Sequence, residues 1–189
     1  MEYPGYGIYR GKATPENLEE DSSYVYKFVT KILQIKPSDI IIFGRSIGSG
    51  PATYLASTKQ VGSLLLMSAY TSIRNVVRDY IGPFGSLIGE RFPNYERIKH
   101  VKCPVLFIHG YRDKLISYKH SERLCQLCTS NASLVLPYDM THNDFIYETD
   151  VRQPLEWFLE KNALVSSDVM PPLHIPKQLF IKPVLGNNQ

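Results

Sequence analysis

Four short apolar runs constrain the fold of this chain more than any other feature. They cover residues 39–43 (DIIIF), 62–67 (GSLLLM), 104–109 (PVLFIH) and 132–136 (ASLVL). Short, continuously apolar runs are typical of strands that are buried on both faces of a parallel sheet. Segments with the residue pattern of helices lie between and after them, at residues 49–58, 118–127 and 151–161. This alternation predicts an α/β fold with a mostly parallel sheet of about four main strands flanked by helices.

A further helix is predicted before the first run. Thr14, Pro15 and Glu16 supply a capping hydroxyl, a proline at the first helical position and an acid in the first turn. Apolar residues then recur at helical spacing from Leu18 onward, so we expect this helix to continue to about Leu33.

The composition is that of a globular domain, with 43% hydrophobic and 21% charged residues. It changes near Asn162, after which four prolines and little periodicity follow. We therefore predict a domain over residues 1–162 and an extended or disordered tail over residues 163–189. A short linear recognition segment is the alternative for the tail.

Charge and cysteine content exclude several classes of protein. The net charge is +3 and no dense Lys/Arg run occurs, so a nucleic-acid partner is not indicated. Three cysteines do not make a disulfide framework and fit a reducing, cytoplasmic location. No apolar stretch approaches 18 residues, so no transmembrane segment is expected.

Cys125 and Cys128 form a C-x-x-C pair without a second Cys or His pair, which predicts two half-buried thiols rather than a metal or redox site.

A serine lies between two glycines directly after the first apolar run, in the segment Gly44-Arg45-Ser46-Ile47-Gly48. Between a predicted strand and a predicted helix, this G-x-S-x-G pattern predicts a sharp turn that lifts the serine oxygen above the sheet. The glycines leave room where side chains would collide, and the helix N-terminus favours developing negative charge. An ordinary glycine-rich turn is the alternative. We predict Ser46 as a nucleophile and the backbone N–H of Ile47 as an oxyanion donor.

An aspartate and a histidine follow the third and fourth runs. Asp113 lies in a loop just past a strand end, although a turn-forming aspartate explains it equally well by itself. His142 is the only one of five histidines in the loop after the last strand. The order Ser46, Asp113, His142 is that of the α/β-hydrolase triad. Asp139 and Asp144 flank His142 and are alternatives for the orienting acid.

This triad predicts covalent catalysis without a metal or cofactor. Ser46 would attack an acyl carbonyl after giving its proton to His142, while Asp113 would hold the imidazole tautomer. Water would then hydrolyse the acyl-enzyme.

Several segments, including those that contain the three triad residues, carry a family resemblance. They are residues 3–7 (YPGYG), Gly11 with 15–18 (PENL), 43–51 (FGRSIGSGP), 92–94 (FPN), 104–110 with Asp113, and 142–144 (HND). Over roughly residues 3–161 the chain resembles the α/β hydrolases, and more narrowly the alpha/beta hydrolase domain-containing protein 17 group. The resemblance implies a partial α/β-hydrolase fold and the removal of palmitate from proteins, that is, a palmitoyl-protein thioesterase or depalmitoylase.

The N-terminal region departs from that group. There, several strands, the loop with the second oxyanion N–H and a membrane-anchoring cysteine cluster lie upstream of the segment that matches residues 3–7. Here Met1 stands two residues before that segment. We therefore expect a truncated domain with an uncovered strand edge at residues 40–43. Without the second donor we expect turnover to fall by roughly 10²–10³.

The segment from Tyr70 to Phe92 is rich in apolar residues, and two interpretations stay open. It forms either helices that pack on the sheet or a small apolar cap beside the site that suits an acyl chain. Under the second interpretation the candidate substrate-binding residues are Tyr70, Ile73, Phe84 and Met140.

The sequence is compatible with three functions. The first is a serine hydrolase for an acylated protein or lipid-like ester, with peripheral membrane contact as an additional expectation. The second is a serine aminopeptidase-like or small-ester hydrolase on the same fold, since fold does not separate these activities. The third is a catalytically weak fragment that acts as an interaction module.

Overall fold

Four parallel strands form the centre of the computed structural model, which describes residues 1–164. The strands are β1 (Ile41–Arg45), β2 (Ser63–Met67), β3 (Val105–Ile108) and β4 (Ala132–Val135). They pair in the order β1-β2-β3-β4, and all three pairings are parallel. The predicted α/β fold with about four parallel strands is confirmed, and each strand overlaps one of the four apolar runs.

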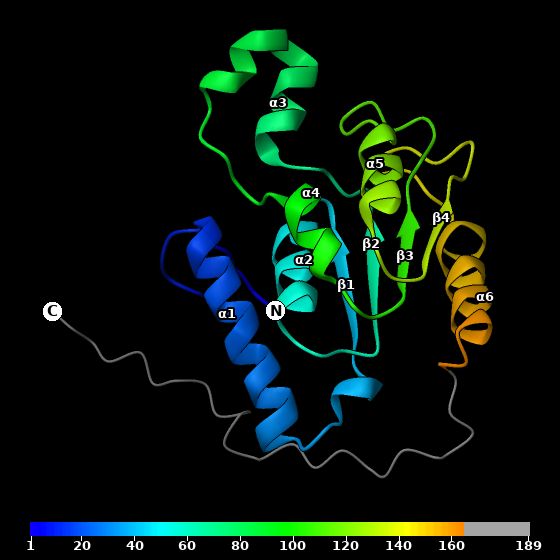
Figure 1. Cartoon of the computed structure of the whole chain (residues 1–189). Helices are drawn as coiled ribbons and strands as arrows, with labels where there is room; N and C mark the ends of the chain where they lie inside the picture. The colour runs from blue at the N-terminus through cyan, green and yellow to red at the C-terminus, as the bar shows by residue number, and fades with distance from the viewer. Residues whose placement is uncertain (165–189) are drawn as a thin grey trace, which may run out of the picture.

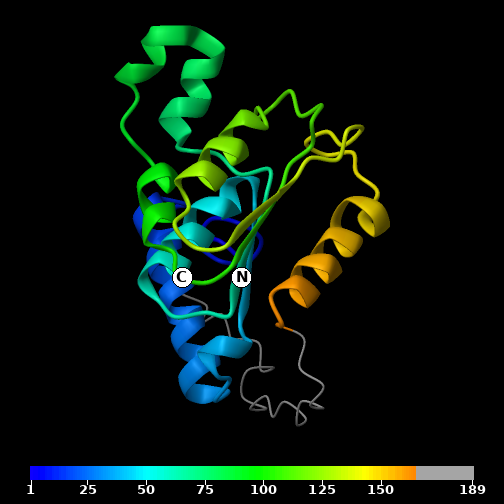
Figure 2. The same ribbon diagram turned by 45° about the vertical axis from the view of Figure 1, so that its right-hand side comes forward.

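Helices cover both faces of this sheet (Figures 1 and 2). The α-helices are α1 (Pro15–Lys27), α2 (Ser49–Thr58), α3 (Ile73–Ile81), α4 (Asn94–Arg97), α5 (Lys119–Leu127) and α6 (Gln153–Lys161). Shorter 3-10 segments are η2 (Pro37–Asp39), η3 (Ser46–Gly48), η4 (Gly82–Leu87) and η5 (Ile98–His100), and π-helical turns are η1 (Phe28–Ile32) and η6 (Tyr147–Arg152). No helix within residues 1–164 is long and apolar enough to cross a membrane.

Alternate strand residues point to two separate cores. On one face Leu64, Leu66 and Phe107 pack with α2 and α5. On the other face Leu65 and Leu106, with their strand neighbours, pack with Phe158 of α6. Both β2 and β3 are buried along their whole length, as expected for central strands of a parallel sheet.

The first helix begins where the sequence predicts and changes form before its predicted end. The Thr14 hydroxyl accepts the Asn17 N–H at 3.2 Å, with Pro15 at the first helical position. The α-helix ends at Lys27 and continues as the π-helical turn η1. In this turn the Thr30 hydroxyl donates to the Tyr26 carbonyl at 2.9 Å. Such bonding of a side chain to the preceding turn disturbs regular helix geometry.

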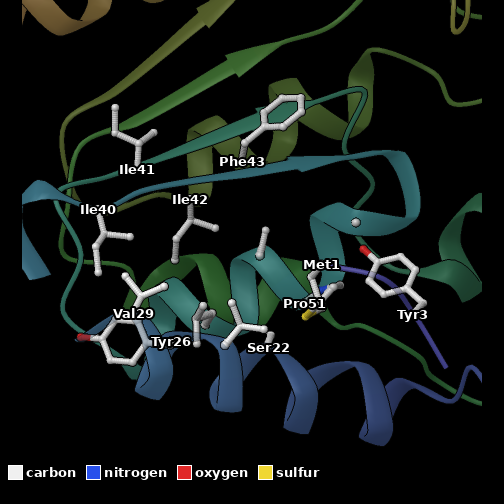
Figure 3. Close-up of a pocket in the computed structure, with 14 residues that line it drawn as sticks. Met1, Tyr3, Ser22, Tyr26, Val29, Ile40, Ile41, Ile42, Phe43 and Pro51 are labelled. Carbon is white, nitrogen blue, oxygen red and sulfur yellow. The ribbon is translucent and has the colours of Figure 1, made fainter. Parts of the chain in front are cut away.

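Strand β1 has a free edge, because β2 is its only partner among the described residues. Ile41 and Phe43 are 46% and 54% exposed. Beside this edge lies a groove of about 450 Å³, with β1 on one side and Tyr26 of α1 and Val29 of η1 on the other (Figure 3). The uncovered edge expected at residues 40–43 is present within the described part of the chain.

The segment between Tyr70 and Phe92 forms a projecting arm. Helix α3 packs against η4 and not against the sheet, and the arm rises beyond the carboxyl ends of the strands (Figures 1 and 2). The interpretation in which these helices pack on the sheet is therefore wrong for α3 and η4. The predicted tail at residues 163–189 lies, except for its first two residues, outside the described part of the chain.

Candidate active site

Ser46 occupies a tight turn between β1 and α2. Its φ is +50°, a left-handed conformation that non-glycine residues rarely adopt. A side chain at Gly44 would place its Cβ 2.5 Å from the Ala52 Cβ and 2.7 Å from the Gly48 carbonyl oxygen, so only glycine fits there. At Gly48 the one close atom is the Tyr3 hydroxyl at 3.1 Å. The crowding expected across the turn therefore applies to Gly44 more than to Gly48.

The loops after β3 and β4 lie against each other. A Cβ at Gly110 would collide with the Met140 carbonyl, so the absence of a side chain there allows the close approach. The Tyr111 N–H donates to the Pro137 carbonyl at 3.0 Å, and the Arg112 N–H donates to the Met140 carbonyl at 3.1 Å. These contacts bring the loop that carries Asp113 beside the loop that carries His142.

Ser46, His142 and Asp113 form one chain of contacts. The Ser46 Oγ lies 3.1 Å from His142 Nε2, and His142 Nδ1 lies 2.8 Å from Asp113 Oδ2. Asp113 and His142 are buried, whereas Ser46 is partly exposed. Since a carboxylate can only accept, Nδ1 carries the proton in this arrangement and Nε2 is left to accept the serine proton.

Asp113 is held as a carboxylate by several donors. Its Oδ1 accepts the N–H groups of Leu115 and Ile116, both at 2.9 Å. Burial by itself raises the pKa of Asp113, but hydrogen bonds from His109, Ile116 and His142 outweigh it and lower the pKa to about 2. The group is therefore negatively charged at neutral pH and can stabilise an imidazolium at His142.

His109 contributes to this site, although the sequence analysis gave it no role. It is fully buried at the end of β3, with Nε2 2.9 Å from the Ile116 carbonyl and 3.3 Å from Asp113 Oδ2. Its Nδ1 lies 2.7 Å from the Ser121 hydroxyl. With the proton on Nε2, His109 donates toward both oxygens and accepts from Ser121. The available sequence signal was its place at a strand end, four residues before Asp113.

Arg45 is a second residue that the sequence analysis did not assign. Its guanidinium donates to the His142 carbonyl and, at 3.0 Å, to Asn143 Oδ1. It also lies over the Phe145 ring, 5.8 Å from the centroid. Because Arg45 immediately precedes Ser46, one strand end carries the candidate nucleophile and holds the loop of the candidate base.

The predicted oxyanion donor, the Ile47 N–H, belongs to the peptide that directly follows Ser46. The Tyr70 hydroxyl donates to the Ile47 carbonyl at 3.1 Å and so fixes the next peptide of the turn. Tyr70 is 1% exposed, and burial raises its pKa, which keeps the phenol protonated as a donor. Tyr70 thus supports the turn from inside the protein.

The structure does not bring the four candidate substrate-binding residues to one surface. Tyr70 and Met140 are both 1% exposed and belong to different cores. Ile73 packs against the Tyr70 cluster, whereas Phe84 lies on the arm and is 72% exposed. Apolar character alone does not distinguish a core position from a pocket wall, which is why the sequence grouped them.

The alternative orienting acids make other contacts. Asp139 pairs with Arg112 at 3.0 Å, and Asp144 accepts the Thr141 hydroxyl at 2.9 Å.

Cys125 and Cys128 are partly buried free thiols at the end of α5, as the C-x-x-C interpretation expected. Over residues 1–164, no three His, Cys, Asp or Glu side chains group as metal ligands.

Residues 6–143 match the family described as "Serine hydrolase (FSH1)". This range contains Ser46, Asp113 and His142. The chain belongs to the FSH1 serine hydrolase family.

Curated relatives of this chain carry α/β-hydrolase names. Alpha/beta hydrolase domain-containing protein 17B from Homo sapiens is 31% identical over 143 residues, which are 76% of this chain and 49% of the relative. Alpha/beta hydrolase domain-containing protein aho-3 from Caenorhabditis elegans is 28% identical over 162 residues, 86% of this chain and 48% of the relative. The chain thus spans about half the length of these relatives, and the expected resemblance to the 17 group is confirmed.

Solved structures support the fold of this family member. Acetyl xylan esterase from Paenibacillus sp. R4 matches with a TM-score of 0.63 at 16% identity, over 85% of this chain and 60% of that one. Uncomplexed Pyrococcus horikoshii acylaminoacyl peptidase matches with a TM-score of 0.61 at 14% identity, over 82% of this chain and 29% of that one. The fold is that of the α/β hydrolases, in agreement with membership of a serine hydrolase family.

Proposed function

We propose that this protein cleaves acyl esters or thioesters through a catalytic triad of Ser46, His142 and Asp113. The observation that carries the proposal is the continuous chain of contacts from Ser46 Oγ through the imidazole to the Asp113 carboxylate, at 3.1 and 2.8 Å. The left-handed turn at Ser46 and the helix that follows it support a role as nucleophile.

In the proposed reaction Ser46 Oγ forms a bond to the acyl carbon as its proton moves to His142 Nε2. The carbonyl oxygen becomes an oxyanion, to which the Ile47 N–H donates. When the carbon–sulfur or carbon–oxygen bond breaks, His142 returns the proton to the leaving thiolate or alkoxide. A water molecule then loses its proton to His142 and attacks the acyl-enzyme, which releases the acid and Ser46.

The substrate class that we propose is a protein thioester of a fatty acid, which would make the protein a palmitoyl-protein thioesterase. Support comes from the similarity to the 17 group and from the openness of the turn, because Ser46 is partly exposed and Ile47 is 45% exposed. An open site suits an acyl group attached to a folded protein. Such substrates present their acyl chains at membranes, so cytoplasmic action with peripheral membrane contact is part of the proposal.

The test compares acyl chain length and leaving group. Fluorophosphonate labelling establishes an active serine, with Ser46→Ala as the control. Nitrophenyl esters from C2 to C12 and S-palmitoyl peptides are then compared with amino-acid amides. Each additional buried methylene should improve binding by about 0.8 kcal/mol, or roughly fourfold, until the site is full. A flat or falling response from C2 to C12 would remove the long-chain substrate from the proposal.

Two other functions give different results in the same experiment. Hydrolysis of amino-acid amides in preference to acyl esters would indicate a serine aminopeptidase, and a preference for short esters a small-ester hydrolase. The solved structures that match include a protein titled as a peptidase and one titled as an acetyl xylan esterase. Labelling of Ser46 without turnover would instead favour a catalytically weak interaction module.

A further inference from the structure

The projecting arm carries large apolar side chains that face solvent. Tyr80, Ile81, Phe84 and Leu87 lie at the end of α3 and on η4, and Leu87 is 86% exposed. The arm stands at the end of the sheet where the loops after β3 and β4 lie (Figures 1 and 2). Exposed apolar side chains gathered on one element indicate an interaction surface.

The arm is held in a defined position. The Tyr80 hydroxyl donates to the carbonyls of Lys114 and Leu115 at 3.1 and 2.6 Å, which ties the end of α3 to the loop after β3. Arg74 Nε donates to the Ile88 carbonyl at 2.8 Å and so closes η4 back onto α3. The apolar side chains are therefore presented by a braced element.

A basic hollow adjoins the arm. It has a volume of about 460 Å³, and its lining includes Pro83 of η4 together with Arg78, Lys119 and Arg123. Within residues 1–164 none of these three cations pairs with a carboxylate, and the hollow's own acid, Asp79, bonds His120 at 3.0 Å. Pro83 directly precedes Phe84, so the positive charge and the apolar residues are contiguous.

We propose that this arm surface, made of Tyr80, Ile81, Phe84, Leu87, Arg78, Lys119 and Arg123, docks on an anionic lipid bilayer. Apolar side chains enter the boundary between headgroups and acyl chains, while flanking cations meet lipid phosphates and carboxylates. Charge complementarity favours a bilayer over a protein partner. An anionic bilayer meets both the apolar side chains and the cations, whereas a protein that binds the apolar side chains does not require three unpaired cations beside them. The inference deepens the proposed function, since docking would turn the Ser46 end of the sheet toward the membrane.

The test is flotation of the full chain with vesicles of phosphatidylcholine alone or with 30% phosphatidylserine. Flotation separates bound protein from aggregates, which sink. All proteins carry Ser46→Ala, so that binding is measured without hydrolysis, and fluorophosphonate labelling of the parent chain tests the proposed function separately. We expect binding to the anionic vesicles that weakens at high salt, because surface charge is screened.

Two double variants test the two halves of the surface. The first double variant, Phe84→Asp with Leu87→Asp, removes two apolar side chains that would enter the bilayer. The second, Lys119→Glu with Arg123→Glu, reverses two charges, and one cation near an anionic surface changes binding about fivefold. Each double variant should lower vesicle partitioning at least tenfold. The matched controls lie at the opposite end of the sheet. Ile32→Asp replaces an apolar residue that is 58% exposed, and Lys59→Glu with Lys102→Glu changes another hollow that holds two lysines. The controls should bind as the parent does.

Three results would overturn the proposal. The first is that the chain with Ser46→Ala and no other substitution does not bind anionic vesicles at low salt. The second is an equal loss in the control variants, which would indicate general charge attraction. The third is displacement by inorganic phosphate with no effect of Phe84→Asp and Leu87→Asp, which would indicate a soluble phosphate-bearing ligand in the hollow. Circular-dichroism melts establish that each variant is folded.

Discussion

Residues 1–164 contain more than one trio of hydroxyl, histidine and aspartate, and two of these trios lie in different environments. In the first, Ser46 contacts His142 Nε2 and Asp113 contacts Nδ1. In the second, the Thr71 hydroxyl lies 2.8 Å from His120 Nδ1, and Asp79 lies 3.0 Å from Nε2. The same three functional groups are therefore connected through the two imidazole nitrogens in opposite order.

The hydroxyl groups are placed differently. Thr71 is 6% exposed, its Oγ1 accepts from Asn75 at 3.0 Å, and its own N–H donates to His120 Nδ1 at 3.3 Å. That nitrogen already has a backbone donor, so it is a poor acceptor for the threonine proton. Ser46 is partly exposed in a left-handed turn at the start of a helix. The turn, and not the set of side chains, therefore distinguishes a candidate nucleophile from a structural hydroxyl.

Removal of the hydroxyl groups should separate the two trios most strongly in activity. Ser46→Ala should abolish fluorophosphonate labelling and lower ester turnover by about 10⁶-fold, because the nucleophile is lost. Thr71→Ala should keep both labelling and turnover within a few-fold of the parent. Labelling gels and steady-state rates measure the two outcomes. If folded Thr71→Ala also lost labelling, the distinction between the trios would be broken.

The two aspartates should differ next. Asp113→Asn should lower kcat by about 10⁴-fold, because an amide no longer holds the productive imidazole tautomer. Asp79→Asn should change kcat by no more than a few-fold, because the Asp79 side chain is 55% exposed and bonds a histidine that does not contact Ser46. Steady-state kinetics on a nitrophenyl ester compares them. Equal losses in two folded variants would contradict the assignment of the acid.

The free energy of unfolding at acid pH should also distinguish Asp113 from Asp79. The pKa of Asp113 is lowered to about 2 in the fold, from an ordinary value of 3.8. Its contribution to the free energy of unfolding is therefore complete above about pH 4 and is lost as the pH falls toward 2, by up to about 2 kcal/mol. Denaturant titrations between pH 2 and 5 should show this loss in the parent and in Asp79→Asn. In Asp113→Asn the loss should be smaller.

The smallest effect concerns His120. Burial lowers the pKa of His120, an effect that Asp79 partly offsets. The folded state thus binds the proton less readily than the unfolded state, so stability should decrease as the pH falls below the ordinary histidine pKa of 6.5. The same titrations between pH 5 and 8 measure it, with His120→Gln as the comparison. An increase in stability on acidification that depends on His120 would contradict the stated direction.

The sequence predicted the parts of the site that are local. The β1 run, the glycine that the turn requires and the positions of Asp113 and His142 after strand ends are all visible in short segments. The roles of Arg45 and His109 were not predicted, because they depend on how two loops pack. Arg45 and His142 are 97 residues apart in the sequence. The trio of Thr71, His120 and Asp79 was not predicted for the same reason, since these residues are brought together only in the folded chain.

The arm shows a different limit of sequence interpretation. Its apolar residues recur at helical spacing, a pattern that is usually explained by packing on a core. Whether such a face meets the sheet or solvent depends on the direction in which the chain leaves β2. That direction is set by the burial of Tyr70 and by contacts of Asn94, whose amide donates to the Tyr70 carbonyl at 3.0 Å. No local pattern encodes these contacts.

The link from Arg45 to the loop of His142 has a consequence for local unfolding. That loop is bonded on one side to the end of β1 and on the other side to the loop of Asp113, through the Arg112 N–H and the Met140 carbonyl. Opening the loop therefore requires breaking contacts on both sides. Its amide protons should exchange with solvent as one cooperative group, with an opening free energy well above that of an ordinary surface loop. Ser46, His142 and Asp113 should then lose their mutual positions together rather than one at a time.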